Sequence, residues 1–369
     1  MKSLYKTFLS AVFTLVCCAT IIAGNPDRQG ESGAAELLLN PWARSAGLHS
    51  MNTSTISGLE SMRLNIAGLS RLEGREVAVT NLRLYEGSDV RMNAIGFGNK
   101  IGKNSAFGVT LSSMDFGEIQ TTTTDRPEGT GSTFSPSFFH IGLGYSYIYD
   151  NKISVGLLVR GVSESLQNVR AFGFAIDAGV QYVTGEDDNF RLGISLRNVG
   201  SPMSFSGQGL ATAVTAPGSD FPLIVEQRAE RFELPSQLNI GVSYDFFLRH
   251  NSIKPIGEEA AADPVDSKPS KEFILRVLGN FTSNAFSRDQ IGVGAELIWN
   301  RMFTLRAAYR EEIGDTGFIE DNIYTGLAVG GSVEIPFSKS GASRIGVDYA
   351  YRTTDPFRGS HNFTLRLMF

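Results

Sequence analysis

Apolar and polar residues alternate along most of this chain, and the alternation predicts β-strands. In residues 139–147 every second position is apolar or aromatic, whereas the positions between hold histidine, glycine or serine. Residues 172–182 and 238–246 repeat the pattern. Because successive side chains of a strand point to opposite faces, each of these strands has one apolar face and one small or polar face.

The alternation predicts fourteen strands between Arg75 and the C-terminus. Their expected spans are residues 75–85, 90–100, 104–116, 134–149, 152–167, 170–184, 189–199, 233–248, 272–281, 289–299, 302–310, 322–335, 343–352 and 360–369. Most of these spans are long, and a tilted strand needs about 9–11 residues to cross a bilayer. The count is even, which returns both ends of a barrel to the same side of the membrane.

The connections between these strands alternate in length. Asp150-Asn151 and Asn300-Arg301 are tight turns, and residues 101–103, 185–188 and 336–342 are short. The intervening loops 117–133, 200–232 and 311–321 are longer. Short periplasmic turns and longer outer loops are typical of outer-membrane barrels. The polar segment 249–271 is an exception on the periplasmic side, either an inserted loop or a missed pair of strands.

A soluble β-sandwich would also show this alternation. The strand lengths favour a membrane barrel, and so do the aromatic residues near strand ends, where the membrane interfaces lie. In hydrocarbon every backbone N–H and C=O must be paired within the protein, and a closed barrel achieves this because it has no edge. We therefore expect an all-β transmembrane barrel of about fourteen antiparallel strands in the outer membrane of a Gram-negative bacterium, in contact with its lipid.

The first 74 residues do not alternate. Lys2 and Lys6 precede an apolar run over residues 8–23, which predicts a signal peptide at 1–24. Both cysteines lie in this run, so the mature chain would form no disulfide. Their surroundings match a lipoprotein box poorly, and lipidation is the minor alternative. Residues 25–74 are expected to form a compact N-terminal segment with a helical turn or two, and residues 75–369 the barrel.

Composition supports a barrel. The chain has 40 glycines and 25 phenylalanines, and only 19% of its residues are charged. A soluble enzyme usually has about a quarter of its residues charged, and a helical membrane protein would exceed this chain's mean hydropathy of −0.05. The formal net charge of −5 is scattered, which gives no surface for nucleic acid.

The chain ends on an alternating segment whose last residue is aromatic. Phe363, Leu365, Leu367 and Phe369 occupy one face, and Thr364, Arg366 and Met368 the other. This segment resembles the closing strand of bacterial outer-membrane barrels. In those proteins the barrel assembly machinery reads the terminal aromatic residue, so Phe369 is the expected assembly signal.

Several ionisable residues fall on the inward face of the predicted strands. They are Asp177, Arg191, Arg197, Asp245, Glu296, Arg306, Arg310, Asp348 and Arg366. They could orient a ligand or hold the N-terminal segment by charge-assisted hydrogen bonds. The simpler interpretation, which we favour, is an internally paired or solvated lining of the kind found in barrels generally. Their mixed signs argue against a strongly ion-selective pore.

No residue pattern predicts catalysis, a metal or a cofactor. The four histidines lack metal-ligand spacing, and Asp187-Asp188 is most simply a polar turn. Catalytic Ser/His/Asp or Cys/His patterns do not stand out either, so we expect a protein that is not an enzyme.

Two long loops are the best candidates for contact with a partner protein. Loop 117–133 contains Thr121 and Pro127, and loop 200–232 contains Phe221, Leu223 and Ile224 among polar residues. Apolar residues exposed on an outer loop suggest protein contact. They could equally fold into the barrel mouth as a lid.

The chain resembles the PorV/PorQ family of outer-membrane proteins, which is related to FadL-type long-chain fatty acid transporters. The segments that carry the resemblance are 115–134, 141–146, 172–179, 191–200 and 205–207. Upstream, Ala43-Arg44 with Gly47-Leu48 is similar to the family's Ala-Arg-x-x-Gly-Met segment, and residues 65–69 are similar to its Asn-Pro-Ala-Gly-Leu turn. Two departures stand out: Ile66 replaces the proline, and His49 and Ser50 occupy the place of a Gly-Gly pair.

The resemblance implies a fourteen-stranded barrel with the N-terminal segment in or against the lumen. The plug motif would be Arg44, Gly47, Asn65, Gly68 and Leu69. It also implies a non-enzymatic role in type IX secretion and surface attachment, in which the barrel binds the translocon or the C-terminal signal domains of secreted proteins. An alternative is a FadL-like channel for hydrophobic small molecules. A third possibility is an outer-membrane protein with a mainly structural role. Transport requires a continuous apolar pocket in the lumen, with a lateral gap or a kinked strand. The strands show no apolar luminal stripe, which favours the binding role.

Overall fold

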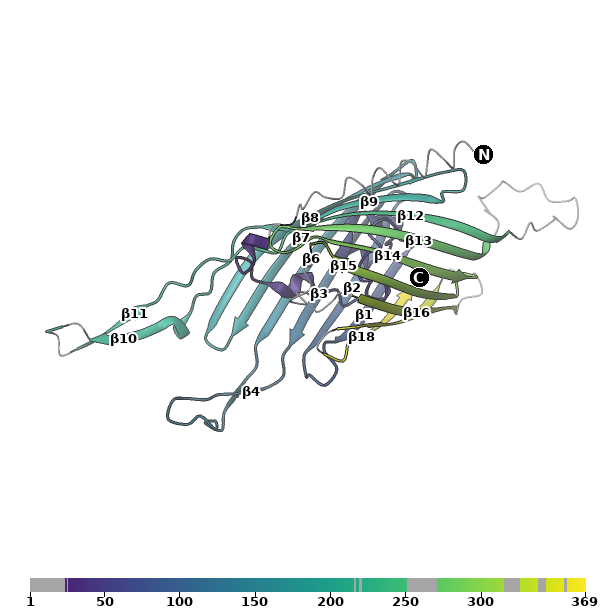
Figure 1. Cartoon of the computed structure of the whole chain (residues 1–369). Helices are drawn as coiled ribbons and strands as arrows, with labels where there is room; N and C mark the ends of the chain where they lie inside the picture. Colours follow the sequence, from purple (N-terminus) through teal and green to yellow (C-terminus); the bar gives the residue numbers. More distant parts are fainter. Residues whose placement is uncertain are drawn as a thin grey trace, which may run out of the picture.

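Fourteen antiparallel strands close into a barrel. A computed structural model describes residues 24, 26–215, 217–218, 221–250, 271–314, 326–337, 343–354 and 357–369. Around the barrel the strands follow chain order, and β18 pairs with β1 to close it (Figure 1). They are β1 (Arg75–Arg83), β2 (Arg91–Ile101), β3 (Ser105–Asp115), β6 (Ser137–Tyr149), β7 (Ile153–Leu166), β8 (Val169–Thr184), β9 (Phe190–Gly200), β12 (Gln237–His250), β13 (Lys271–Asn284), β14 (Gln290–Trp299), β15 (Phe303–Glu312), β16 (Gly326–Pro336), β17 (Arg344–Arg352) and β18 (Ser360–Met368). The predicted barrel and its number of strands are confirmed.

Strand boundaries moved by a few residues from the predicted spans. β12 and β13 pair directly up to His250 and Lys271, so among the described residues no missed pair of strands separates them in the barrel. The rest of the predicted segment 249–271 lies outside the described residues, as do residues 322–325 of the predicted strand 322–335.

Two short hairpins extend from the long loops. β4 (Ile119–Gln120) pairs with β5 (Thr133–Phe134), and β10 (Ala211–Thr215) pairs with β11 (Pro222–Glu226). Both project beyond the barrel wall at the left of Figure 1, opposite the end that carries the C-terminus. We take the hairpin end as extracellular, because long loops lie on that side of outer-membrane barrels.

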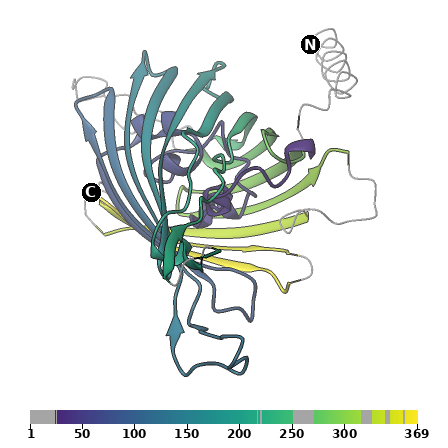
Figure 2. The same cartoon turned by 90° about the vertical axis from the view of Figure 1, so that its left-hand side faces the viewer.

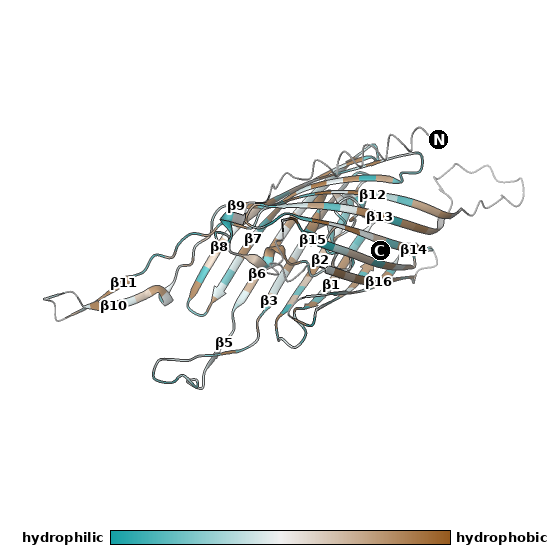
Figure 3. Ribbon diagram, viewed as in Figure 1, coloured by the Kyte–Doolittle hydropathy of each residue, from teal (hydrophilic) through white to brown (hydrophobic). Residues whose placement is uncertain are grey.

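The two faces of the wall differ as the alternation predicts. In β8 the outward-facing Phe172, Phe174 and Ile176 are exposed, whereas the inward-facing Ala175 and Asp177 are buried. Apolar side chains dominate the outward positions around the wall, and Figure 3 shows this as brown colour along the strands. Among the described residues, no helix has both the length and the apolar composition needed to cross a bilayer.

The N-terminal segment fills the lumen. Figure 2 looks in from the hairpin end and shows the purple segment inside the ring of strands. We call residues 26–74 the plug. Its elements are η1 (Pro26–Arg28), η2 (Ala35–Leu38), α2 (Ala43–Ala46), α3 (Ser61–Leu64) and η3 (Ile66–Arg71). η3 packs against β3, β6, β7 and β8, and α2 against β16, β17 and β18.

Large plug side chains form the core together with small wall residues. Leu59, Met62 and Leu69 are fully or almost fully buried in a cluster with Ala78 and Ala94 of the wall. Burying each such side chain stabilises the fold by about 1.5–3 kcal/mol. A barrel this wide therefore has a hydrophobic core because the chain places its own N-terminal segment inside.

Inward-facing glycines let the plug approach the wall. A Cβ on Gly156 would lie 2.8 Å from the carbonyl carbon of Ile66, and one on Gly144 or Gly96 would clash with Ile66 or Leu59. Such close approach is possible only where no side chain intervenes. Many of the chain's glycines therefore form a surface fitted to the plug.

His49 and Ser50, two consecutive residues of the plug, have a glycine-like backbone. His49 and Ser50 both have positive φ, 49° and 58°. Each left-handed non-glycine residue costs roughly 1–2 kcal/mol. The turn is held by the bond from the Ser50 N–H to the Ser45 carbonyl (2.7 Å) and by burial of His49.

Candidate functional site

A cavity of about 620 Å³, which we call the vestibule, opens at the extracellular mouth above the plug. It is lined by Gly33, Ala34, Ala35, Glu36, Leu38, Leu39, Ser50, Leu64, Tyr85, Met114, Phe116, Phe138, Glu164, Arg197, Gln237, Asn239, Thr282, Asn284, Ser287, Gln290, Arg310 and Arg352. Apolar members come mainly from the plug, from β3 and β6, and from the segments that follow β1 and β3. Polar members come mainly from β9, from β12 to β15 and from β17. The vestibule is therefore amphipathic.

The apolar side of the vestibule is a packed cluster. Leu39, Tyr85, Phe116 and Phe138 surround the buried Met114 and its neighbours. The rings of Phe116 and Phe138 meet edge to face with centroids 4.8 Å apart. We expected no apolar stripe on the luminal face, and this cluster corrects that expectation at the mouth. Met92, Met114 and Phe138 are inward-facing residues of β2, β3 and β6, and Leu39, Tyr85 and Phe116 from outside the strands complete the surface.

The polar side ties the wall to the plug. Arg197 donates to the Gln237 side chain (3.2 Å) and to the Leu37 carbonyl (3.3 Å), and Gln237 donates to Asn284 (2.7 Å). Arg310 donates to the carbonyl of His49 (3.3 Å). Arg197 and Arg310, predicted to face inward, thus do so and also hold the plug.

The floor of the vestibule contains a buried acidic side chain of the plug. Glu36 lies 3.0 Å from the His140 imidazole of β6, and burial raises the pKa of Glu36. Arg63 binds the backbone carbonyls of Glu36 (2.7 Å) and Leu39 (2.8 Å). These bonds fix the segment of plug that separates the vestibule from the rest of the lumen.

β8 and β9 are joined through a β-bulge near the vestibule. Their register shifts between Ile176 and Ala178, so that Asp177 lies opposite two residues of β9. Asn198 there has a left-handed backbone (φ 57°), and its N–H donates to Asp177 (2.6 Å). Arg160 of β7 pairs with Asp177 at 2.7 Å. Asp177 is thus the anchor of a local bend in the wall, because bulges increase twist and bend the strand.

Most of the other inward-facing ions form one network. We call it the charge belt, and its members are Arg191, Asp245, Arg276, Glu296, Arg306, Glu334, Asp348 and Arg366. The two chains of contacts are Arg191–Asp245–Arg276–Glu296–Arg306 and Asp348–Arg366–Glu334, with N–O distances of 2.6 to 3.2 Å. Ser332 accepts from Arg306 between the two chains. Six of these residues were predicted from the sequence; Arg276 and Glu334 were not.

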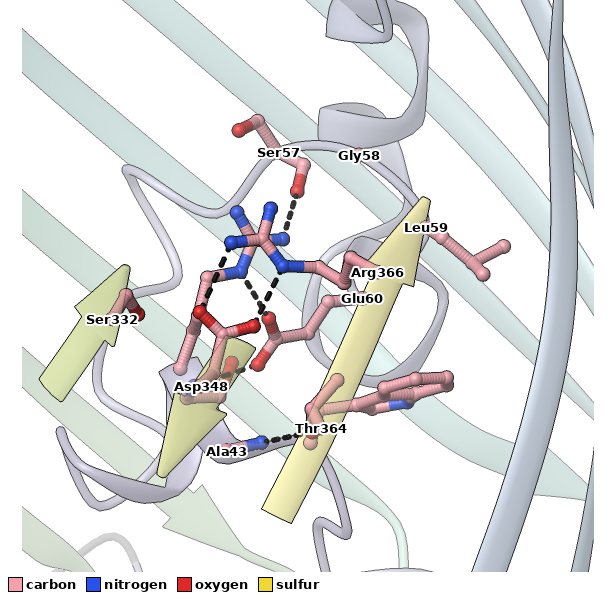
Figure 4. Close-up of polar contacts among 12 residues, drawn as sticks. Ala43, Ser57, Gly58, Leu59, Glu60, Ser332, Asp348, Thr364 and Arg366 are labelled. Atoms are coloured by element: carbon pink, nitrogen blue, oxygen red, sulfur yellow. Dashed lines mark hydrogen bonds and ion pairs between the residues drawn. The ribbon is translucent and has the colours of Figure 1, made fainter. Parts of the chain in front are cut away.

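The plug meets the charge belt through α2 and α3. Arg44 pairs with the buried Glu60 at 2.7 Å, and Glu60 also accepts from the Ser45 N–H at 2.6 Å. The Ala43 N–H donates to Thr364 of β18 (3.0 Å). Figure 4 shows Glu60 beside the Asp348–Arg366 pair. Paired charges thus line much of this periplasmic half of the lumen.

The remaining plug-motif residues make close backbone contacts. Asn65 accepts from the Ala67 N–H and donates to the carbonyls of Thr53 (3.0 Å) and Val180 (3.1 Å), which links η3 to β8. The Gly68 carbonyl accepts from Gly58. Leu69 is fully buried, and Gly47 lies against the wall at β16.

The predicted partner-loop residues lie outside the barrel. Thr121 and Pro127 belong to the extension that carries β4 and β5. Phe221 and Ile224 of the β10–β11 hairpin are 77% and 81% exposed, and Leu223 is also exposed. Phe369 lies at the opposite end, where its backbone exchanges two hydrogen bonds with Arg75 (2.7 and 2.9 Å) and completes the β1–β18 seam.

The described residues contain no group of His, Cys, Asp and Glu that could hold a metal ion. The lumen instead offers two kinds of surface, an amphipathic vestibule outside and a paired charge belt inside. The geometry suits binding of a molecule at the mouth.

Comparison with known proteins identifies relatives by structure alone. No protein-family profile matches the sequence, and no curated protein sequence matches it. The CymD monoaromatic hydrocarbon channel superimposes with a TM-score of 0.52 at 14% identity, covering 89% of this chain and 97% of that one. The toluene transporter TodX of Pseudomonas putida gives 0.49 at 15% identity over 89% and 98%. A FadL homologue of Pseudomonas aeruginosa gives 0.46 at 12% identity over 88% and 97%.

At these identities the likeness shows the fold. The CymD channel, whose TM-score exceeds 0.5, has the same barrel fold as this chain. A closed barrel whose outward residues are apolar also requires lipid around it. The protein is thus an integral β-barrel of the outer membrane with the fold of the CymD channel.

Proposed function

We propose that this barrel takes up hydrophobic small molecules, in the manner of a FadL-like channel, and that the vestibule is where they first bind. The observation that carries the proposal is the packed apolar side of a cavity of about 620 Å³ at the extracellular mouth. Ligand pockets commonly have volumes of about 300–1,000 Å³ and few polar groups. The structural neighbour CymD is a monoaromatic hydrocarbon channel, which agrees with this class of molecule.

Passage beyond the vestibule requires movement of the plug. The periplasmic half is held by the charge belt and by glycine contacts, whereas the vestibule floor is held mainly by Arg63 and by the Glu36–His140 contact. The bulge of β8 and β9 at Asp177 and Asn198 supplies a bent wall beside this floor. We propose that the bound molecule moves between the floor and this bend.

The experiment is uptake of a radiolabelled monoaromatic hydrocarbon by cells that depend on this barrel. Leu39→Asp with Met114→Asp places two charges on the apolar side, and should reduce the uptake rate at least about tenfold, which corresponds to about 1.4 kcal/mol of lost binding. Ile119→Asp is the matched control, since Ile119 is equally apolar but lies in the β4–β5 hairpin outside the vestibule. Equal uptake by the double variant and the wild type would refute the proposal.

The second candidate is the PorV/PorQ-like role, binding of secreted proteins or of the type IX translocon through the outer loops. Support comes from the β10–β11 hairpin, whose two strands are exposed at every residue. Thr212, Val214, Leu223 and Val225 share one face of it by register. An isolated two-stranded hairpin is marginally stable in water, and its apolar surface favours a covering protein.

The hairpin can be removed without disturbing the vestibule. Met203 and Phe232 pair through their backbones (2.9 Å) and pack on the plug, so the deletion should stop short of them. Replacing residues 211–226 with a short Gly-Ser linker keeps that contact. Loss of cargo or translocon pull-down with normal hydrocarbon uptake would assign the binding role to the hairpin. Unchanged pull-down would show that the hairpin does not bind these partners.

A further inference from the structure

The lipid-facing wall has a hollow of about 590 Å³ over β1, β2 and β3. We call it the notch. Phe363 of β18 borders it on one side and Phe139 of β6 on the other. Its location is outside the barrel, separate from the vestibule and the charge belt.

Short polar side chains create the notch. Five residues stand side by side across neighbouring strands, in the order Phe363, Asn81, Asn93, Ser113 and Phe139. The three central residues are smaller than the phenylalanines that flank them, so the surface dips between the rings. Asn81 donates to Asn93 at 2.7 Å. One hydrogen bond leaves other donors and acceptors of the two amides available to a ligand.

Two arginines lie at the extracellular edge of the notch. Arg83 stands directly opposite Arg91, two residues along each strand from Asn81 and Asn93. Both arginines are exposed, and neither forms an ion pair within the part of the chain that the structure describes. Like charges directly opposite each other destabilise a sheet. An anion bound between them would remove this repulsion.

The neighbours in the same row offset only part of this charge, because one carboxylate faces two arginines. Asp115 stands opposite Arg91, and its Oδ1 accepts from the Gly117 N–H (2.9 Å). His361 stands opposite Arg83, and its Nδ1 lies 2.8 Å from the Tyr349 hydroxyl.

The floor of the notch is apolar. Val79, Ile95 and Leu111 form the next row toward the periplasm, and all three are exposed. Val79 precedes Arg83 by four positions on β1, which corresponds to about 10 Å along the barrel axis for a tilted strand. A cationic rim, an amide middle and an apolar floor therefore follow one another from the surface into the bilayer.

We propose that the notch binds one phosphorylated lipid of the outer leaflet. Its phosphate lies between Arg83 and Arg91, since guanidinium groups bind phosphate in bidentate, charge-assisted fashion. Its ester or amide linkage bonds to Asn81 and Asn93. An acyl chain lies over Val79, Ile95 and Leu111, between the two phenylalanine rings. This site does not depend on what the lumen transports.

The experiment is native mass spectrometry of the full, folded barrel in detergent with lipid A as the probe. The wild type should retain one bisphosphorylated lipid A, and Arg83→Ala with Arg91→Ala should weaken retention at least about tenfold, as expected for two lost charge-assisted contacts. Ser113→Phe fills the notch and should weaken retention to a similar extent with both arginines present. Dephosphorylated lipid A should bind poorly, and free inorganic phosphate should not displace the lipid.

The controls lie on the same outer surface. Arg75→Ala removes an exposed arginine of β1 at the periplasmic boundary, and Ala178→Phe adds a ring on β8 away from the notch. Both variants should retain lipid A like the wild type. Equal retention by the double arginine variant, by Ser113→Phe or by dephosphorylated lipid would overturn the proposal. The finding that an outer-membrane protein occupies the notch in place of lipid would also overturn it.

Discussion

Gly47 of the plug lies directly against Gly330 of the barrel wall. A Cβ on Gly47 would come within 3.0 Å of the Gly330 Cα, and a Cβ on Gly330 within 3.2 Å of the Gly47 Cα. Backbone therefore packs on backbone where α2 meets β16, and glycine is needed on both sides. This contact fixes the plug just beside the charge belt.

Gly330→Val should loosen the plug. Overpacking a closely packed site costs about 1–3 kcal/mol, and displacement of α2 would relieve it. We expect a lower unfolding midpoint in urea and a higher ion conductance in planar bilayers. Gly331→Val is the matched control, because a Cβ there meets nothing closer than 3.8 Å. If both variants conduct like the wild type, the plug does not depend on this contact.

Alternation predicts which residues face the lumen, but it does not predict their partners. Asp245 and Glu296 lie at inward positions of well-patterned strands, so the sequence places them correctly. Their shared partner Arg276 depends on the register of β13 with β12 and β14. Its own strand is mostly apolar on both faces near this point, which hides its orientation.

The vestibule was not predicted, because residues outside the strands complete its apolar side. Leu39 belongs to the plug, whereas Tyr85 and Phe116 follow the ends of β1 and β3. The pairing of β1, β2 and β3 brings Tyr85 and Phe116 together, and the position of the plug in the lumen adds Leu39. Short hairpins such as β4–β5 were missed for a related reason: a two-residue strand is too short to show a period.

Glu296→Gln should strongly destabilise the barrel. Glu296 accepts from both Arg276 (3.0 Å) and Arg306 (2.7 Å), and all three side chains are largely buried. Removing one partner of a buried ion pair typically costs about 3–5 kcal/mol, because the other charge stays buried. Urea unfolding followed by heat-modifiable migration would measure the loss.

An exposed ion pair provides the comparison for Glu296. Glu73 pairs with Arg344 at 3.0 Å, but its side chain is 73% exposed. Exposed pairs contribute about 0–1 kcal/mol, so Glu73→Gln should shift the midpoint little. Similar shifts for Glu73→Gln and Glu296→Gln would show that the charge belt is no more than a solvated lining.

Acid should weaken the plug through His49. Burial, with the nearby charges of Arg310 and Arg352, lowers the pKa of His49 from 6.5 to about 2. The unfolded chain therefore binds a proton below pH 6.5 that the folded chain does not. The contribution of His49 to the free energy of unfolding is therefore fully present above pH 6.5. It decreases as the pH falls below that value, by at most about 1.4 kcal/mol per pH unit.

His49→Asn tests this dependence directly. Asparagine cannot take up the proton and tolerates the left-handed backbone better than most residues. The unfolding midpoint of the variant should fall less steeply than that of the wild type below pH 6.5. Above pH 7.5, about one unit beyond the transition, the difference between the two proteins should be constant. Parallel curves through the acidic range would show that His49 is protonated in the folded barrel.

Phe369 contributes to the barrel in two separable ways. Its backbone exchanges two hydrogen bonds with Arg75 at the β1–β18 seam, and its ring is half exposed at the periplasmic end. Deleting Phe369 removes both features, whereas Phe369→Ala removes only the ring. Two backbone hydrogen bonds contribute about 1–3 kcal/mol together, too little to prevent a barrel from closing.

If the assembly machinery reads the terminal aromatic ring, Phe369→Ala should assemble as poorly as the deletion. Phe369→Tyr should restore assembly, since it keeps an aromatic ring at the last position. The measurement is the fraction of heat-modifiable barrel in outer-membrane fractions after a pulse of synthesis. Normal assembly of Phe369→Ala beside a defective deletion would assign the effect to the seam hydrogen bonds, because only these differ between the two variants.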